Sequence, residues 1–206
     1  MEFNDKQIEI LQVAEKLFAE EGFDGTSVRD IAKKASINVA MISYYFGSKA
    51  KLLEAIVINR IGSLGLKLEN LVQENISPIQ KMDRIIEYYI HQVNSNRHIH
   101  QILQQESKNK KREINLEAFI EVKKNNLKLV SSVVKEGQEQ GLFQPNVNVA
   151  LLSPIIIGSL VYFHMNRELY HDLFGLKTDE DFSNYIETEL TQHIQKTIKA
   201  LLVNEN

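Results

Sequence analysis

Apolar residues recur at helical spacing along nearly the whole chain. In residues 5–21 they fall on one face of a helix: Ile8, Leu11, Ala14, Leu17 and Phe18. Gly22 follows and is expected to end this helix. Two much shorter helical patterns come next, over residues 28–35 and 39–45, with only a few residues between them. Two short helices joined so closely must cross at a steep angle, which predicts a helix-turn-helix.

Both short helices begin with a recognisable cap. Ser27 and Asp30 have the spacing of a capping box, in which each side chain bonds the backbone amide of the other residue. Asn38 is a natural N-cap for the helix that follows it. In the first short helix the apolar residues are spaced to face inward and the basic residues to face outward: Val28, Ile31, Ala32 and Ala35 against Arg29, Lys33 and Lys34.

Longer helical patterns occupy the rest of the chain. One begins near Lys49, and Ser77 with Pro78 predicts the N-cap and first turn of another, which runs to about Asn94. Further helices are expected over 98–108, 114–138, 148–172 and 180–203, with a kink at Pro154. The predicted fold is therefore all-α, with about nine helices. A DNA-binding domain is expected over residues 1–48, and a helical ligand-binding and dimerisation domain over residues 49–206.

The composition supports a helical protein and excludes several kinds of chemistry. Only 9 glycines and 3 prolines interrupt 206 residues, whereas a sandwich or barrel needs many turns. The absence of cysteine excludes disulfides, thiolate metal sites and a cysteine nucleophile. Nucleophile-elbow, P-loop and dinucleotide motifs are also absent, so we predict no catalytic residues, no cofactor and no metal site. The longest apolar stretch, residues 155–163, is too short to cross a bilayer and no secretory signal is evident, so a cytoplasmic protein without membrane contact is expected.

The charge is distributed unevenly along the chain. The net charge is −3, which argues against a general nucleic-acid coat. Residues 26–51, however, hold five basic residues and one acidic residue, whereas residues 1–25 hold two lysines and seven acids. A local basic patch on a mildly acidic protein is typical of a docking surface for a polyanion.

The helix-turn-helix region resembles the N-terminal domain of the tetracycline-repressor (TetR) family. The resemblance begins with Thr-Ser-Val-Arg-Asp-Ile-Ala at 26–32, and its most specific part is Tyr-Tyr-Phe-Gly-Ser-Lys-Ala-Lys-Leu-Leu at 44–53. It implies a bacterial repressor that binds a palindromic DNA operator as a homodimer. It also implies a C-terminal domain that binds a small organic effector and releases the DNA, because ligand binding changes the spacing of the two DNA-binding modules.

The resemblance and the helix starts together predict which residues contact the DNA backbone. The N-termini of the two short helices are expected to face phosphates, at Ser27, Val28, Asn38 and Val39, with Arg29 beside them. Lys49 matches a phosphate clamp of the family, and Tyr44 and Tyr45 match hydroxyl donors to phosphate. Packing beneath the module is the alternative for both tyrosines. Phe46 is expected to pack in the core against the first helix.

The base-reading positions depart from the usual pattern. Residues 39–43 are Val-Ala-Met-Ile-Ser, and none of these side chains makes a bidentate bond to guanine or adenine. Ile42 is expected to face inward. Val39, Ala40 and Met41 are then left to contact base edges, and Ser43 adds a hydroxyl. Apolar groups favour the methyl group of thymine, so we predict T-rich contacted positions, with part of the specificity arising from DNA shape.

The C-terminal helices predict a dimer interface and, less specifically, an effector pocket. Residues 148–172 are apolar on more than one face, which suits a helix between its own bundle and a partner subunit. The last helix was expected to join this interface through Ile186, Leu190, Ile194, Ile198 and Leu201. Aromatic and amide side chains are typical of a small-molecule cavity and equally of a helical core. The candidates for effector binding are Tyr88, Tyr89, Gln92, Gln105, Phe119, Tyr162 and Phe163.

Two other signals have ordinary explanations, and two other functions stay open. Histidines at 98, 100, 164 and 171 lack a ligand network, so a solvated or packed role is favoured over metal binding. The basic run 108–112 falls at a predicted turn and suits a solvated loop. The first alternative function is a constitutive architectural or division-linked DNA binder without an inducer. The second is a helical-bundle enzyme or scavenging carrier in which the module is incidental.

Overall fold

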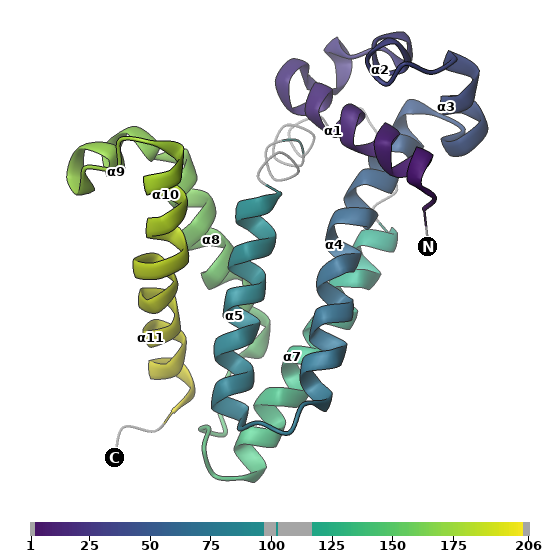
Figure 1. Cartoon of the computed structure of the whole chain (residues 1–206). Helices are drawn as coiled ribbons and strands as arrows, with labels where there is room; N and C mark the ends of the chain where they lie inside the picture. Colours follow the sequence, from purple (N-terminus) through teal and green to yellow (C-terminus); the bar gives the residue numbers. More distant parts are fainter. Residues whose placement is uncertain (1–2, 97–101, 103–116, 204–206) are drawn as a thin grey trace. The chain divides into compact units, whose positions relative to one another are not determined.

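The computed structural model describes residues 3–96, 102 and 117–203, and no strand occurs among them (Figure 1). The prediction of an all-α fold is confirmed. The chain packs into two compact units, one of residues 1–63 with 96–122 and the other of residues 64–95 with 123–206. The boundary between these two packing units falls within a helix. The expected helix over 98–108, Gln105 and the basic run 108–112 lie outside the described residues.

Four helices provide most of the described part of the N-terminal unit, which also includes the first residues of α7 (Glu117–Glu139). They are α1 (Asp5–Gly25), α2 (Val28–Lys34), α3 (Val39–Phe46) and the first part of α4 (Lys49–Gln73). Its core takes the predicted apolar residues of α1 except Ile8, which is 36% exposed, together with the inward residues of the other helices. The most deeply buried members are Ile10, Ala14, Phe18, Ile31, Ile42 and Leu52. The short helices therefore have no core of their own and are held by α1 and α4.

Backbone geometry explains how α1 and α2 end. Gly22 interrupts α1 with φ +74°, in the left-handed region that favours glycine, and a short helical segment continues to Gly25. At the end of α2, Ser36 adopts φ +53°. The amide of Ser36 bonds Lys33 O at 3.2 Å, and that of Ile37 bonds Ala32 O at 2.9 Å. This is a Schellman motif with serine in the position where glycine is usual, and it makes the turn of the helix-turn-helix.

The C-terminal unit holds the remaining helices around a larger core. The later part of α4 lies with α5 (Pro78–Ser95), and α7 (Glu117–Glu139) contributes its later turns. After the 3-10 turn η1 (Val149–Leu151) come α8 (Leu152–Met165), α9 (Arg167–Phe174), α10 (Asp179–Tyr185), the π-helical turn η2 (Ile186–Leu190) and α11 (Thr191–Leu202). α5 packs against both α8 and α11. The predicted cap at Ser77 is confirmed, because its hydroxyl accepts from the Gln80 amide at 3.3 Å.

The single helix expected over 148–172 is wrong. The chain breaks at Asn166, with ψ +34°, and α9 leaves the direction of α8 at 81° (Figure 1). The Asn166 side chain bonds Tyr162 O at 2.8 Å and so ends α8 by hydrogen bonding one of its last carbonyls. The bend therefore lies at an asparagine and not at Pro154, which occupies the first turn of α8, where a missing N–H costs little.

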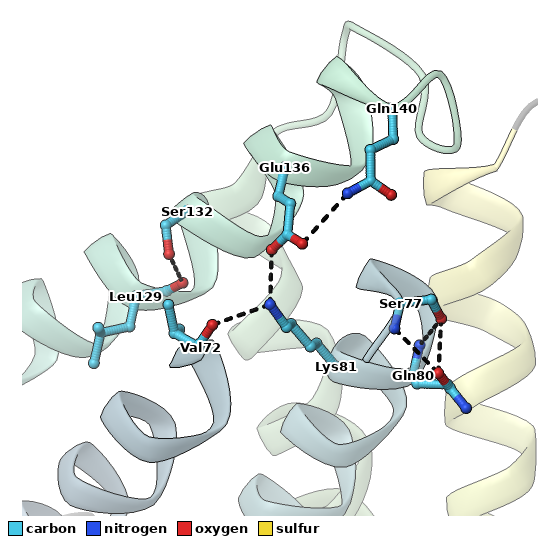
Figure 2. A network of polar contacts seen from close by, with 8 residues as sticks. All are labelled: Val72, Ser77, Gln80, Lys81, Leu129, Ser132, Glu136 and Gln140. Atoms are coloured by element: carbon cyan, nitrogen blue, oxygen red, sulfur yellow. Dashed lines mark hydrogen bonds and ion pairs between the residues drawn. The ribbon is translucent and has the colours of Figure 1, made fainter. Parts of the chain in front are cut away.

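A buried lysine joins three helices of the C-terminal unit (Figure 2). The ammonium of Lys81, on α5, donates to Val72 O at 3.0 Å, near the end of α4. It also lies 2.9 Å from Oε2 of Glu136, on α7. The Lys81 side chain is 5% exposed, so the carbonyl and the carboxylate replace water around the charge. This contact fixes the α4–α5 corner against α7.

The described residues contain neither a single membrane-spanning helix nor a metal-binding cluster of side chains. Within these ranges, no individual helix has both the length and the apolar character needed to cross a bilayer. The bent pair α8–α9 satisfies the length and composition criteria together. In the same part of the chain, no three histidine, aspartate or glutamate side chains are grouped as a metal site would require.

Candidate nucleic-acid interface

The third helix of the N-terminal unit presents one face to solvent and buries the other. Ile42 is 1% exposed and Phe46 is 7% exposed, and both belong to the core shared with α1, as expected. Val39 is 40% exposed, and Ala40 and Ser43 are also exposed. The exposed face is therefore the predicted base-reading face.

Asn38 holds the start of α3 in place. Its side-chain oxygen accepts a hydrogen bond from the Ala40 amide at 2.9 Å, and the residue is extended, with ψ +136°. The predicted N-cap is confirmed. Met41 lies at the edge of the exposed face and is half-buried. The three apolar side chains that start α3 thus lie together at the end of the helix that a major groove would receive.

The capping box of α2 is confirmed. Ser27 Oγ accepts from the Asp30 amide at 3.2 Å, and the Ser27 amide donates to Asp30 Oδ2 at 2.9 Å. Hydrogen bonds from the hydroxyl and amide of Ser27 lower the pKa of the Asp30 carboxyl below its usual range. Ser27 and Arg29 are exposed, whereas Val28 is half-buried against the core.

Two adjacent tyrosines at the end of α3 have different surroundings. Tyr44 is 83% exposed, and its ring contacts Tyr45 edge-on at 5.2 Å between centroids. Tyr45 is half-buried and packs on the core, with its ring 6.3 Å from that of Phe46. Tyr44 is thus placed to donate its hydroxyl outward. The ring of Tyr45 instead packs beneath the module, which is the alternative given above for both tyrosines.

Lys49 begins α4, as expected, but its ammonium is engaged inside the unit. It donates to Phe23 O at 2.7 Å and to Thr26 O at 2.8 Å, and it lies 4.3 Å from the centroid of the Phe23 ring. The sequence carried no signal for this contact, because its partners are backbone carbonyls more than 20 residues away. The outward basic side chains of the patch are Arg29, Lys33, Lys34 and Lys51.

The candidate effector residues do not all lie in one unit. Tyr89 and Phe163 are buried in the C-terminal core, Tyr88 packs against it and Gln92 is half-buried on α5. Burial raises the pKa of the Tyr89 hydroxyl, and a hydrogen bond with Ser153 opposes the rise. Tyr162 is 58% exposed. Phe119 packs on the core of the N-terminal unit, so the described candidates form no single group.

The helices predicted for the dimer interface also differ from the expectation in detail, since Ile186, Ile194 and Ile198 are at most 2% exposed within the protomer's own core. These three side chains therefore cannot face a partner subunit. Exposed apolar side chains gather instead on α8 and α9, with one on α11: Tyr162, Met165, Leu169, Leu173, Phe174 and Leu201.

Comparisons with known proteins place both units in one family. Residues 10–56 match the family described as "Bacterial regulatory proteins, tetR family", and residues 78–198 match "Tetracyclin repressor-like, C-terminal domain". The HTH-type transcriptional repressor KstR2 of Mycolicibacterium smegmatis is 26% identical over 145 residues, covering 70% of each chain. The probable HTH-type transcriptional regulator YttP of Bacillus subtilis is 41% identical over 78 residues, covering 38% of this chain and 37% of that protein.

Solved structures show the same fold. The transcriptional regulator FadR from Bacillus subtilis, in complex with stearoyl-CoA, superposes with a TM-score of 0.73 at 19% identity. The match covers 94% of this chain and 97% of that one. At this identity the likeness concerns the arrangement of helices.

Proposed function

The chain belongs to the TetR family of bacterial regulatory proteins, and from that membership we propose how its parts recognise DNA and respond to an effector. It is a ligand-responsive, DNA-binding transcriptional repressor. A constitutive architectural binder without an inducer is not favoured, because KstR2, which matches 70% of the chain, is a repressor. The relatives are regulators rather than enzymes. DNA binding is assigned to residues 1–48, and effector binding and dimerisation to residues 49–206.

The observation that carries the DNA-reading proposal is the division of α3 into a buried and an exposed face. With Ile42 and Phe46 in the core, Val39, Ala40 and Met41 lead the helix into the major groove, and Ser43 follows one turn later. Apolar groups at these positions pack on thymine methyl groups. The operator half-site therefore contains thymine at the contacted positions, and sequence-dependent DNA shape supplies further specificity.

Contacts with phosphates surround this reading face. Ser27, Arg29, Asn38 and Tyr44 are exposed in the same unit and supply hydroxyl, guanidinium and amide donors. Val28 and Tyr45 complete the set by position, whereas the Lys49 ammonium is bonded to backbone carbonyls within the unit. Such contacts set the register of the protein on DNA without reading its sequence.

A homodimer would present two such units to a palindromic operator. We place its interface on α8 and the α10–α11 segment, and the exposed apolar side chains of α8 support this. Tyr162 and Met165 are 58% and 64% exposed, far more than large apolar side chains in a protomer's own core. α9 adds the exposed Leu169 and Leu173. The two-fold symmetry of the dimer would then match the two half-sites.

The effector is a small organic molecule bound in the C-terminal unit. Tyr88, Tyr89 and Gln92 on α5 and Phe163 on α8 remain the candidate contacts, since α5 and α8 pack directly together. They combine aromatic walls with hydroxyl and amide groups, as small-molecule sites do. The neighbouring FadR structure contains stearoyl-CoA, which makes an acyl-CoA a sensible first probe.

One experiment tests the repressor function as a whole. The purified full chain is used to select duplexes from a random library and from bacterial genomic fragments, and the selected sites are footprinted. The footprint is then repeated with stearoyl-CoA and with fractionated metabolite extracts. We expect a palindromic footprint that one of these additions removes. If no duplex binds with salt-dependent affinity, the DNA-binding function is wrong; if the footprint resists every fraction, the inducible function is wrong.

A further inference from the structure

Lys49 is engaged with the protein's own backbone at a point where a DNA contact was expected. We propose that Lys49 is a positioning residue, which fixes the α1–α2 junction against the start of α4 and acts on DNA affinity through that junction rather than through a phosphate. This inference rests on the proposed DNA-binding function, because the junction carries the start of α2.

The Lys49 ammonium caps the end of α1. The last carbonyls of a helix have no partner within the helix, and a basic side chain can satisfy them. Phe23 lies in the last turn of α1 and Thr26 is its C-cap residue, and Lys49 Nζ bonds both carbonyls at 2.7 and 2.8 Å. The Phe23 ring lies 4.3 Å from the same nitrogen and adds a cation–π contact.

Thr26 is held from two directions. Its side chain is fully buried, and its hydroxyl lies 2.9 Å from Gly22 O and 3.2 Å from Leu17 O, both on α1. Its carbonyl is bonded by Lys49, on α4. The next residue, Ser27, starts the capping box of α2. The first turn of α2 is therefore fixed to α1 and to α4 through a single residue.

The basic side chains of the N-terminal unit differ in how available they are to DNA. An ammonium has three N–H donors, and two of those of Lys49 point to carbonyls inside the unit. To grip a phosphate, Lys49 would have to weaken these bonds and release the α1 terminus. The exposed Lys33 and Lys34 face no such cost. The salt dependence of DNA binding should therefore come from the exposed basic side chains.

Salt titration separates the two roles of a lysine. Affinity falls with salt, and each phosphate contact that is lost reduces the magnitude of the slope of log affinity against log salt by about 0.9. We would measure binding of the full-length protein to its selected duplex by fluorescence anisotropy, from about 50 to 200 mM salt. The variants are Lys49→Met, which removes the ammonium, and Lys49→Gln, which is neutral but keeps an amide donor for the carbonyls. Lys34→Met, in an exposed lysine of α2, provides a matched loss of charge.

The positioning role predicts a distinct pattern. Lys49→Met should bind roughly tenfold more weakly, which is about 1.4 kcal/mol, with the wild-type slope. Lys49→Gln should recover part of that affinity, again with the wild-type slope. If the magnitude of the slope were smaller by about 0.9 in both Lys49 variants, as after the loss of a phosphate contact, the inference would be overturned. Wild-type affinity in Lys49→Met would overturn it as well.

A second measurement does not depend on DNA. Hydrogen exchange should be faster at residues 23–31 in Lys49→Met than in the wild type, while exchange in the core of α1 stays unchanged, which also shows that the variant is folded. Unchanged exchange at residues 23–31 would contradict the positioning role. If the wild-type chain binds no duplex but this exchange effect is present, the DNA-binding function fails and the structural role of Lys49 stands.

Discussion

Arg60 Nε lies 2.7 Å from Oε2 of Glu15, so an ion pair joins α4 to α1 within the N-terminal unit. The Glu15 side chain is 5% exposed, whereas that of Arg60 is 32% exposed. A carboxylate buried to this extent is stable in the folded protein only beside a positive charge or hydrogen-bond donors. Together with Lys49, this pair ties the first part of α4 to the helix that carries the core of the unit.

Replacing Arg60 should therefore destabilise the N-terminal unit. Arg60→Met leaves Glu15 buried without its guanidinium partner, and we expect a loss of about 2 kcal/mol in the free energy of unfolding, less than for a fully buried pair because Arg60 is partly solvated. Urea unfolding followed by circular dichroism measures it. The control is Lys16→Met in the exposed Lys16–Glu20 pair, which should cost less than about 0.5 kcal/mol. Equal losses in the two variants would contradict the structural role of Arg60.

Glycine in place of Ser36, in the turn of the helix-turn-helix, should stabilise the folded protein. Ser36 has φ +53°, which costs a residue with a Cβ more than it costs glycine. Ser36→Gly should raise the unfolding free energy by about 0.5 kcal/mol, after the greater freedom of glycine in the unfolded chain is included. Gly47→Ala, at φ +80°, should have the opposite sign. Thermal melting would show both shifts, and a lower melting temperature for Ser36→Gly would contradict the assignment.

The reading face of α3 predicts a change in sequence preference without a general loss of binding. Met41→Ala removes an apolar side chain proposed to pack on a thymine methyl group, so discrimination for thymine at one half-site position should fall by about 1 kcal/mol. Selection from a random duplex library compares the variant with the wild type. Leu66→Ala, which removes a 65% exposed side chain from the later part of α4, should leave the selected sequence unchanged. Wild-type half-sites built on invariant guanines would defeat the thymine prediction.

The buried Lys81 predicts a stability loss in the C-terminal unit. Lys81→Met removes the hydrogen bond to Val72 O and leaves the partly exposed Glu136 without its partner, so we expect a loss of about 2 kcal/mol. For a chain of this size that corresponds to roughly 4–8 °C in melting temperature. Lys135→Met, in an exposed pair on the same helix α7, is the control and should shift the melting temperature by less than about 2 °C.

The capping box of α2 predicts a dependence on acid pH. The pKa of Asp30 is below its usual value in the folded protein, chiefly because the Ser27 hydroxyl bonds the carboxylate. The carboxylate therefore stabilises the fold above the ordinary pKa of aspartate, about 3.9, and this contribution is lost as the pH falls through the lowered pKa. Titration of the Asp30 carboxyl by NMR should show a lowered pKa that returns toward the ordinary value in Ser27→Ala. An unchanged pKa in that variant would show that Ser27 is not the cause.

The sequence was sufficient for the local structure of the N-terminal unit. Helical spacing, the Ser27–Asp30 box and the Asn38 cap are signals within a few residues, and the structure confirms each of them. The contacts of Lys49 and Glu15 could not be predicted in this way. Their partners are 23 to 45 residues distant and include backbone carbonyls, which leave no trace in residue type.

The C-terminal unit shows where periodicity misleads. The apolar pattern continues past Asn166 without a proline or glycine, so nothing in it predicted the break between α8 and α9. The helical spacing of apolar residues also does not distinguish a face that packs within the same chain from one that packs against a partner subunit. Ile194 and Ile198 therefore looked suitable for an interface, although α5 already covers α11.

The bend at Asn166 has a practical consequence for measurements at low concentration. After the bend, Leu169, Leu173 and Phe174 on α9 are each about half exposed, and Met165 at the end of α8 is 64% exposed. In a dilute monomer these apolar side chains would be exposed to solvent, which favours adsorption to plastic and self-association. An affinity measured at nanomolar protein would then depend on how much protein stays in solution as well as on its binding to DNA. Each titration should therefore include carrier protein and a check of the soluble protein concentration.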